Sequence, residues 1–171
     1  MLKKIFITIQ LLFLFLNYGC NKGLSPVSAE QKAGFSGTIT FIGNWPEGIT
    51  RTHLVVFQND LKSAADFNPF NLKFVSLEIP YGIRTYNFNS TDSSYISIGA
   101  GIYHYVAVAQ QKTTDLSLNR KDWSVAGVYY KNGDTSNPGI LEIPENTLVR
   151  NINIVCDFNN PPQQPPGGGD Q

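Results

Sequence analysis

The stretch GIYHYVAVAQQ, residues 101–111, decides the fold class of this chain. It is the longest run of β-branched and aromatic residues, which favour strands over helices. Successive residues alternate between two faces, one with Tyr103 and Tyr105 and the other with Val106 and Val108, and both faces are apolar. We expect the tyrosine face to lie in the core. The opposite face is then covered by residues 59–70 or offered to a partner.

Shorter runs of the same kind surround this stretch. Residues 34–41 alternate strictly between apolar and polar side chains, and turns rich in Gly, Asn, Asp and Pro separate the runs. Residues 59–67 are the one place where helical turns are expected, with Asn59 or Asp60 as the cap. The other predicted strands are 52–58, 72–79, 83–89, 93–99, 124–131, 140–143 and 148–158. The pattern predicts an all-β domain, an antiparallel Greek-key-type β-sandwich of about seven to nine strands, transthyretin-like or Ig-like.

The N-terminus has the layout of an export signal. Lys3 and Lys4 precede an apolar stretch, residues 5–16, and small Gly19 follows it. The stretch is too short to span a bilayer, which needs about 20 apolar residues. We therefore predict a signal peptide over residues 1–19. A buried segment of the folded domain is the alternative.

The residues around Cys20 resemble the lipobox of bacterial lipoproteins. Gly19 fits the position before the cysteine, Leu16 lies one place further back than usual, and Asn17 and Tyr18 depart from the common small or aliphatic residues. The resemblance implies lipid attachment at Cys20 and a membrane-anchored protein of the bacterial cell envelope, on the outer membrane or the periplasmic face. Ordinary signal cleavage without a lipid is the alternative.

Three segments follow the predicted signal peptide. Residues 20–33 combine Pro, Gly, Ser and mixed charges and predict a flexible tether. Residues 34–158 have the size of one domain. Residues 159–171 are rich in Pro and Gly and predict a disordered tail.

Composition limits the partners. Lys+Arg and Asp+Glu are balanced at 13 each, and no run of cations appears, so nucleic acid is not an expected partner. The chain has two cysteines. Cys156 shares a strand face with Ile152, Ile154 and Phe158, so we expect it to pack in the core as a small hydrophobe.

Three stretches resemble transthyretin-like sandwiches, including the prealbumin-like and carboxypeptidase-regulatory-like modules of bacterial envelope proteins. They are SGTITFIGNWPEG (36–48), GIYHYVAVAQQ (101–111) and VRNINIVCDFNN (149–160). Gly101 and Tyr103 match the middle motif of that family, and Val149, Ile152 and Ile154 match its closing strand. These motifs describe packing, so the resemblance implies a fold and a non-catalytic module.

Residues with chemistry are scattered. His53 and His104 lie singly in predicted strands, and the acids are isolated. No G-x-S-x-G, H-E-x-x-H or P-loop occurs, so we predict no catalytic residue, metal site or cofactor. The oxygen donors of residues 131–139 favour a hydrogen-bonded turn over a calcium site, because one carboxylate is too few.

Four aromatic residues lie in or beside loops: Trp45, Trp123, Tyr129 and Tyr130. Exposed Trp and Tyr can stack on sugars or anchor a protein partner, so these are the candidate contact residues. The alternative is that their rings plug the ends of the sandwich.

We therefore predict a non-catalytic, lipid-anchored envelope module with a structural or protein-interaction role. Its expected partners are the membrane, other envelope proteins or glycans. A carbohydrate- or small-ligand-binding lipoprotein is the alternative, favoured by a deep pocket lined by tryptophan and an acid. A contact of histidine with a carboxylate or serine in a cleft would favour a hydrolase.

Overall fold

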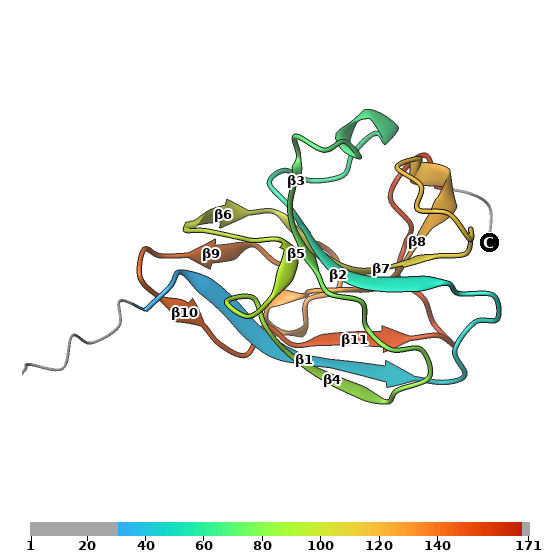
Figure 1. Ribbon diagram of the computed structural model, residues 1–171, viewed down its shortest axis with the longest axis horizontal. Coiled ribbons are helices and arrows are strands. Elements are labelled where there is room, and N and C mark those ends of the chain that lie inside the picture. Colours follow the sequence, from blue (N-terminus) through green and yellow to red (C-terminus); the bar gives the residue numbers. More distant parts are fainter. Residues whose placement is uncertain (1–30, 169–171) are drawn as a thin grey trace, which may run out of the picture. The chain divides into compact units, whose positions relative to one another are not determined.

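The computed structural model describes residues 31–168, and these form an all-β unit (Figure 1). The predicted all-β class is confirmed. The predictions for residues 1–30, including the signal peptide and Cys20, lie outside the described residues, as do residues 169–171. No helix within the described part is long and apolar enough to cross a membrane. The strands are β1 (Gly34–Ile42), β2 (Arg51–Phe57), β3 (Leu72–Ser76), β4 (Thr85–Asn89), β5 (Ser94–Ile96), β6 (Gly101–Tyr103), β7 (Tyr105–Gln111), β8 (Trp123–Val128), β9 (Leu141–Ile143), β10 (Leu148–Val149) and β11 (Ile154–Asp157).

Nine strands form one curled, mixed sheet. Its order is β10-β1-β11-β8-β7-β2-β3-β5, with β4 paired to β1, while β6 and β9 form a separate pair. The predicted wholly antiparallel pairing is wrong at β1, which runs parallel to both β10 and β11. Parallel neighbours need a long connection. Here residues 43–147, most of the domain, connect β1 to β10.

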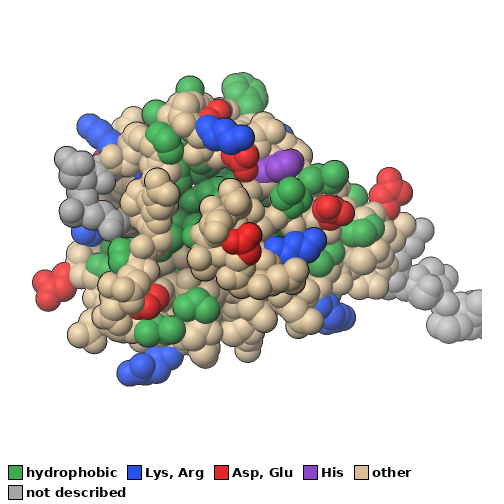
Figure 2. All heavy atoms as spheres, turned by 180° about the vertical axis from the view of Figure 1, so that it is seen from behind, with side chains coloured by type: hydrophobic (Ala, Val, Ile, Leu, Met, Phe, Trp, Pro, Cys, Tyr) green, Lys and Arg blue, Asp and Glu red, His purple; other side chains and the backbone are tan. Residues whose placement is uncertain are grey.

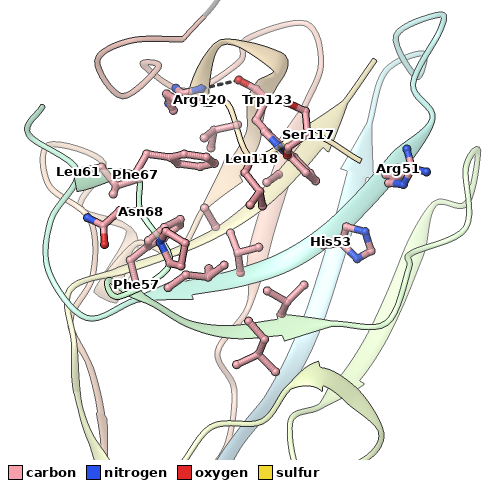
Figure 3. Close-up of a pocket in the computed structure, with 18 of the residues that line it drawn as sticks. Arg51, His53, Phe57, Leu61, Phe67, Asn68, Ser117, Leu118, Arg120 and Trp123 are labelled. Carbon is pink, nitrogen blue, oxygen red and sulfur yellow. Dashed lines mark hydrogen bonds between the residues drawn. The ribbon is translucent and has the colours of Figure 1, made fainter. Parts of the chain in front are cut away.

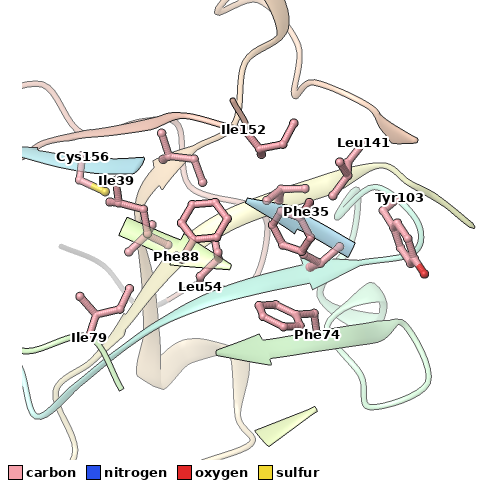
Figure 4. Close-up of a cluster of buried hydrophobic side chains, with 14 of the residues drawn as sticks. Phe35, Ile39, Leu54, Phe74, Ile79, Phe88, Tyr103, Leu141, Ile152 and Cys156 are labelled. Atoms are coloured by element: carbon pink, nitrogen blue, oxygen red, sulfur yellow. The ribbon is translucent and has the colours of Figure 1, made fainter. Parts of the chain in front are cut away.

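The main core lies inside the curl of the sheet (Figure 4). We call it the inner cluster; Phe35, Ile39, Leu54 and Ile154 are among its members and are at most 1% exposed. Cys156 belongs to it and is fully buried, which confirms its predicted place in the core. Burial raises the pKa of the Cys156 thiol, so the sulfur stays protonated at neutral pH.

The stretch that decides the fold class bends at His104. Residues 101–103 leave the main sheet as β6 and pair with β9, whereas β7 pairs with β2 and β8. The bend shifts the alternation, so Tyr103 lies in the inner cluster and Tyr105 on the opposite face of the sheet. Our expectation that the two tyrosines share a face is wrong for this reason.

The C-terminal segment was expected to be disordered, but residues 161–168 lie against the domain. The side-chain amide of Gln164 accepts from the backbone N–H of Val125 at 2.8 Å and donates to the carbonyl of Val125 at 2.9 Å. Arg120 donates through Nη2 to the carbonyl of Pro165 at 2.8 Å. On its β11 side, β8 is bridged only at Val128. At Val125 the side chain of Gln164 therefore makes the two hydrogen bonds that a neighbouring strand would otherwise make. Within the segment predicted to be a disordered tail, residues 161–168 are held against the domain in this way.

Three short 3₁₀ helices interrupt the strands. They are Ala64–Asp66, Arg120–Asp122 and Lys131–Gly133. The first lies within the helical turns expected over residues 59–67, but Ser63 caps it in place of Asn59 or Asp60. In Figure 1 the segment that carries this helix and the segment before β8 both rise above β2 and β7. These two segments form the walls of the site described next.

Candidate functional site

The outer face of the sheet carries a second group of apolar side chains, which we call the outer cluster. It joins alternate residues of β2 and β7 to residues from β8 and from the segment between β2 and β3. Its buried members are Val55, Phe57, Leu61, Tyr105, Ala107, Ala109, Val125 and Val128. Two apolar faces were expected on the central strands, but their places are reversed in β7. Val106 and Val108 lie in the inner cluster, and the face of Tyr105, which was expected in the core, belongs to the outer cluster.

A groove opens over the outer cluster, with a volume of about 560 Å³ (Figure 3). One wall comes from the 58–71 segment and another from the 112–122 segment, while β3 and β5 supply a third. Four apolar side chains on its rim are exposed: Leu116 at 65%, Leu118 at 74%, Tyr95 at 66% and Ile96 at 41%. The volume is within the 300–1,000 Å³ range, roughly, of small-molecule sites.

Two alanines make the floor of the groove concave. On the β2–β7 ladder, Phe57 is paired with Tyr105, Val55 with Ala107, and His53 with Ala109. Side chains on one face of a strand repeat every second residue. The small side chains of Ala107 and Ala109 therefore leave a trough next to the large rings at Phe57 and Tyr105.

His53 lies at one end of the trough and is 5% exposed. Its Nδ1 lies 3.1 Å from the carbonyl oxygen of Ser76. A carbonyl can only accept, so Nδ1 carries the proton and Nε2 is a bare acceptor in the neutral ring. Burial lowers the pKa of His53, although hydrogen bonds to the backbone of Ser76 and Leu77 oppose this shift. The neutral form with a free Nε2 is thus favoured.

Tyr105 and Arg120 lie toward the other end. Tyr105 is 6% exposed, and burial raises the pKa of its hydroxyl, which stays protonated. The guanidinium of Arg120 lies 5.7 Å from the centre of the Phe67 ring. It also donates to the carbonyl of Trp123 (Figure 3). Arg120 therefore fixes the groove wall to β8 and to the C-terminal segment.

The two predicted tryptophans do not meet in one site. Trp123 lines the groove, and its Nε1 donates to the carbonyl of Ser117 at 2.7 Å. Trp45 packs on the inner cluster, with its ring centre 4.5 Å from that of Phe41 and its Nε1 donating to Ile83 at 3.0 Å. Of this pair, the structure places only Trp123 at the groove.

The two predicted tyrosines lie outside the groove lining. Tyr129 packs against the inner cluster and Tyr130 against the outer cluster. Burial raises the pKa of both hydroxyls. Both rings are half-buried, which matches the alternative that they fill space next to the cores.

Within residues 31–168, the groove lining includes one histidine and one carboxylate, His53 and Glu78, and no hydrogen bond joins them. Within residues 31–168, no three His, Cys, Asp or Glu side chains are placed to hold a metal ion. In the same residues, neither histidine hydrogen-bonds to a carboxylate or hydroxyl. Asp134, in the loop tested for calcium, accepts a hydrogen bond from the N–H of Ser136 at 2.9 Å. The loop is thus held by its own turn.

Charges are spread thinly over the surface. On the face shown in Figure 2, Lys, Arg, Asp and Glu side chains lie singly or next to a charge of opposite sign. The one ion pair among the described side chains joins Lys62 and Asp60 at 3.0 Å. The Lys62 side chain is 81% exposed and that of Asp60 is 39% exposed, and pairs that are open to solvent contribute little to stability.

Sequence reasoning missed the residues that make the groove. Two signals pointed to it: the apolar faces of residues 101–111, which include the small Ala107 and Ala109, and the loop aromatic Trp123. The loop residues Phe67, Leu116 and Leu118 carry no motif that would assign them to one site.

No protein-family model, no curated protein and no solved structure matches this chain.

Proposed function

We propose that this protein is a non-catalytic binding module of the bacterial cell envelope that holds a small, largely apolar ligand in the groove. The observation that carries the proposal is a concave, apolar trough of about 560 Å³ with exposed apolar side chains on its rim. A monomeric domain rarely exposes such a surface without a binding role. The lining offers few free polar groups, which favours an apolar ligand over a sugar.

The proposal keeps parts of the interpretation made from the sequence. The module is anchored through a lipid on Cys20, and its curled sheet is a variant of the transthyretin-like sandwich. The groove favours small-ligand binding, with Trp123 as the contact, over a purely structural role. The role that we assign to Trp45, Tyr129 and Tyr130 is packing against the two clusters.

Binding is tested with N-phenyl-1-naphthylamine, a neutral apolar dye, added to the purified full chain. We expect saturable binding at one site per chain. Ala109→Trp should weaken binding at least about tenfold, because an indole on the floor fills the trough. Ala100→Trp is the matched control, since Ala100 is exposed and lies outside the lining. Equal binding by all three proteins, or no saturable binding, would contradict the proposal.

The anchor is tested separately. Cys20→Ala removes the thiol that carries the lipid, so we expect the protein to move from the membrane fraction to the soluble fraction. Stable anchoring needs more than a single acyl chain, so the mass of the wild-type protein should exceed that of the variant by several chains. Unchanged membrane partitioning together with unchanged mass would exclude lipidation.

A further inference from the structure

One tyrosine hydroxyl in the groove lining makes no hydrogen bond within residues 31–168. Tyr105 is 6% exposed and lines the groove, but its Oη donates no hydrogen bond to any described residue. The comparison is Tyr103, also buried, whose hydroxyl donates to the carbonyl of Gly99 at 3.0 Å. Among residues 31–168 no side-chain oxygen or nitrogen is both buried from solvent and without a partner, so this Oη reaches solvent. A ligand in the groove would supply the missing acceptor.

A positive charge lies near the same end. Arg120 is 7% exposed, and within the described residues no carboxylate is within 4.0 Å of it. Within residues 31–168 its two hydrogen bonds go to backbone carbonyls, at Trp123 and Pro165, and these use only part of its five donors. Burial and the nearby Tyr130 hydroxyl raise the pKa of Tyr105, and the charge of Arg120 opposes this shift. Burying a charge is costly unless it is paired.

The other end of the groove is electrically balanced. Arg51 and Glu78 both line it there, with opposite charges, and His53 is neutral. From Tyr105 to Ala109 the floor covers four residues of strand, about 13 Å. The groove thus joins one positive, hydrogen-bond-donating end to an apolar trough.

We propose, on the basis of the function proposed above, that the ligand is an amphipathic carboxylate. Its head lies at Tyr105 and Arg120, and its hydrocarbon chain runs over Ala107 and Ala109 toward His53. One guanidinium matches the single negative charge of a carboxylate, and the Tyr105 hydroxyl donates to one of its oxygens. Charge-assisted hydrogen bonds of this kind are stronger than neutral ones.

The test compares dodecanoate with dodecan-1-ol, two probes with the same chain and different heads. Each is titrated into the purified full chain by calorimetry at pH 8, below the concentration at which micelles form. We expect dodecanoate to bind at least about tenfold more tightly than the alcohol. Tyr105→Phe removes only the hydroxyl, and it should weaken dodecanoate about tenfold while changing dodecan-1-ol much less. Tyr86→Phe is the control, because Tyr86 is a half-buried tyrosine of β4 outside this groove.

The outcomes separate this inference from the proposed function. Equal affinities for the acid and the alcohol, or an unchanged dodecanoate affinity in Tyr105→Phe, would overturn the carboxylate head and leave an apolar site. If neither probe nor the dye binds, both proposals fail. A dimer that dodecanoate does not dissociate would show that a second copy fills the groove, which also overturns the inference. Arg120→Gln gives a second check, with a larger loss expected for dodecanoate than for dodecan-1-ol.

Discussion

Replacing Gly37 by alanine is expected to destabilise the domain by about 3 kcal/mol, near the upper end for overpacking. A Cβ at this position would lie 2.2 Å from the carbonyl oxygen of Ile152. That backbone is fixed, because the Ile152 N–H donates to the carbonyl of Ser36 at 3.1 Å and the Thr38 N–H donates to the side chain of Asn153 at 3.0 Å. Relief of the clash must separate β1 from residues 150–153. The urea midpoint of unfolding measures the loss.

A matched substitution tests whether the clash is the cause. Gly99→Ala makes the same chemical change at a glycine whose added Cβ would have nothing within 4 Å. We expect its stability to stay within about 0.5 kcal/mol of wild type, as is usual for surface positions. If Gly37→Ala has the same midpoint as Gly99→Ala, residues 150–153 are not held against β1 as described.

The sequence predicts strands well where the pairing is regular. β1, β2 and β9 begin and end within one residue of the predicted ranges 34–41, 52–58 and 140–143. Each of these runs continues as one unbroken strand, so its side chains alternate between the two faces of the sheet along its whole length. Local alternation is therefore enough to place them.

Prediction fails where the chain changes its neighbours. The run 101–111 looks continuous, but the bend at His104 separates β6 from β7 and shifts every later side chain to the other face. The run 148–158 likewise divides into β10 and β11, with Asn151 between them at a φ of 64°. Both breaks depend on which distant strand is available for pairing, and local residue types do not encode that.

The site was predictable only in part. Loop aromatics were the signal, and Trp123 does line the groove, but the same signal in Trp45 marks packing on the inner cluster. Sequence gives no distance between loops, so it could not tell which ring shares a wall with Phe67 and Leu118. Composition also predicted a disordered tail over residues 159–171. It could not reveal the hydrogen bonds of the Gln164 side chain to Val125, because that contact joins residues far apart in the sequence.

Replacing Gln164 by glutamate is expected to lower the free energy of unfolding by about 3 kcal/mol at pH 7. The Nε2 of Gln164 donates to the carbonyl of Val125 at 2.9 Å and to the carbonyl of Pro162 at 3.0 Å. In the variant a carboxylate oxygen faces these two carbonyl oxygens, so two hydrogen bonds are replaced by repulsion. The accepting bond from the Val125 N–H, 2.8 Å in the wild type, can remain. The midpoint of thermal or urea unfolding measures the cost.

The loss should depend on pH in a direction that identifies its cause. Because the two carbonyls disfavour the charged form, the pKa of the new carboxyl is raised in the folded state above its unfolded value of about 4.3. Stability relative to wild type is therefore greatest below that value and is lost as the pH rises through the folded pKa. Gln163→Glu is the control, because the neighbouring side chain is exposed and should change stability by less than about 0.5 kcal/mol. Equal stability of the two variants across this range would mean that the C-terminal segment does not pair with β8 in solution.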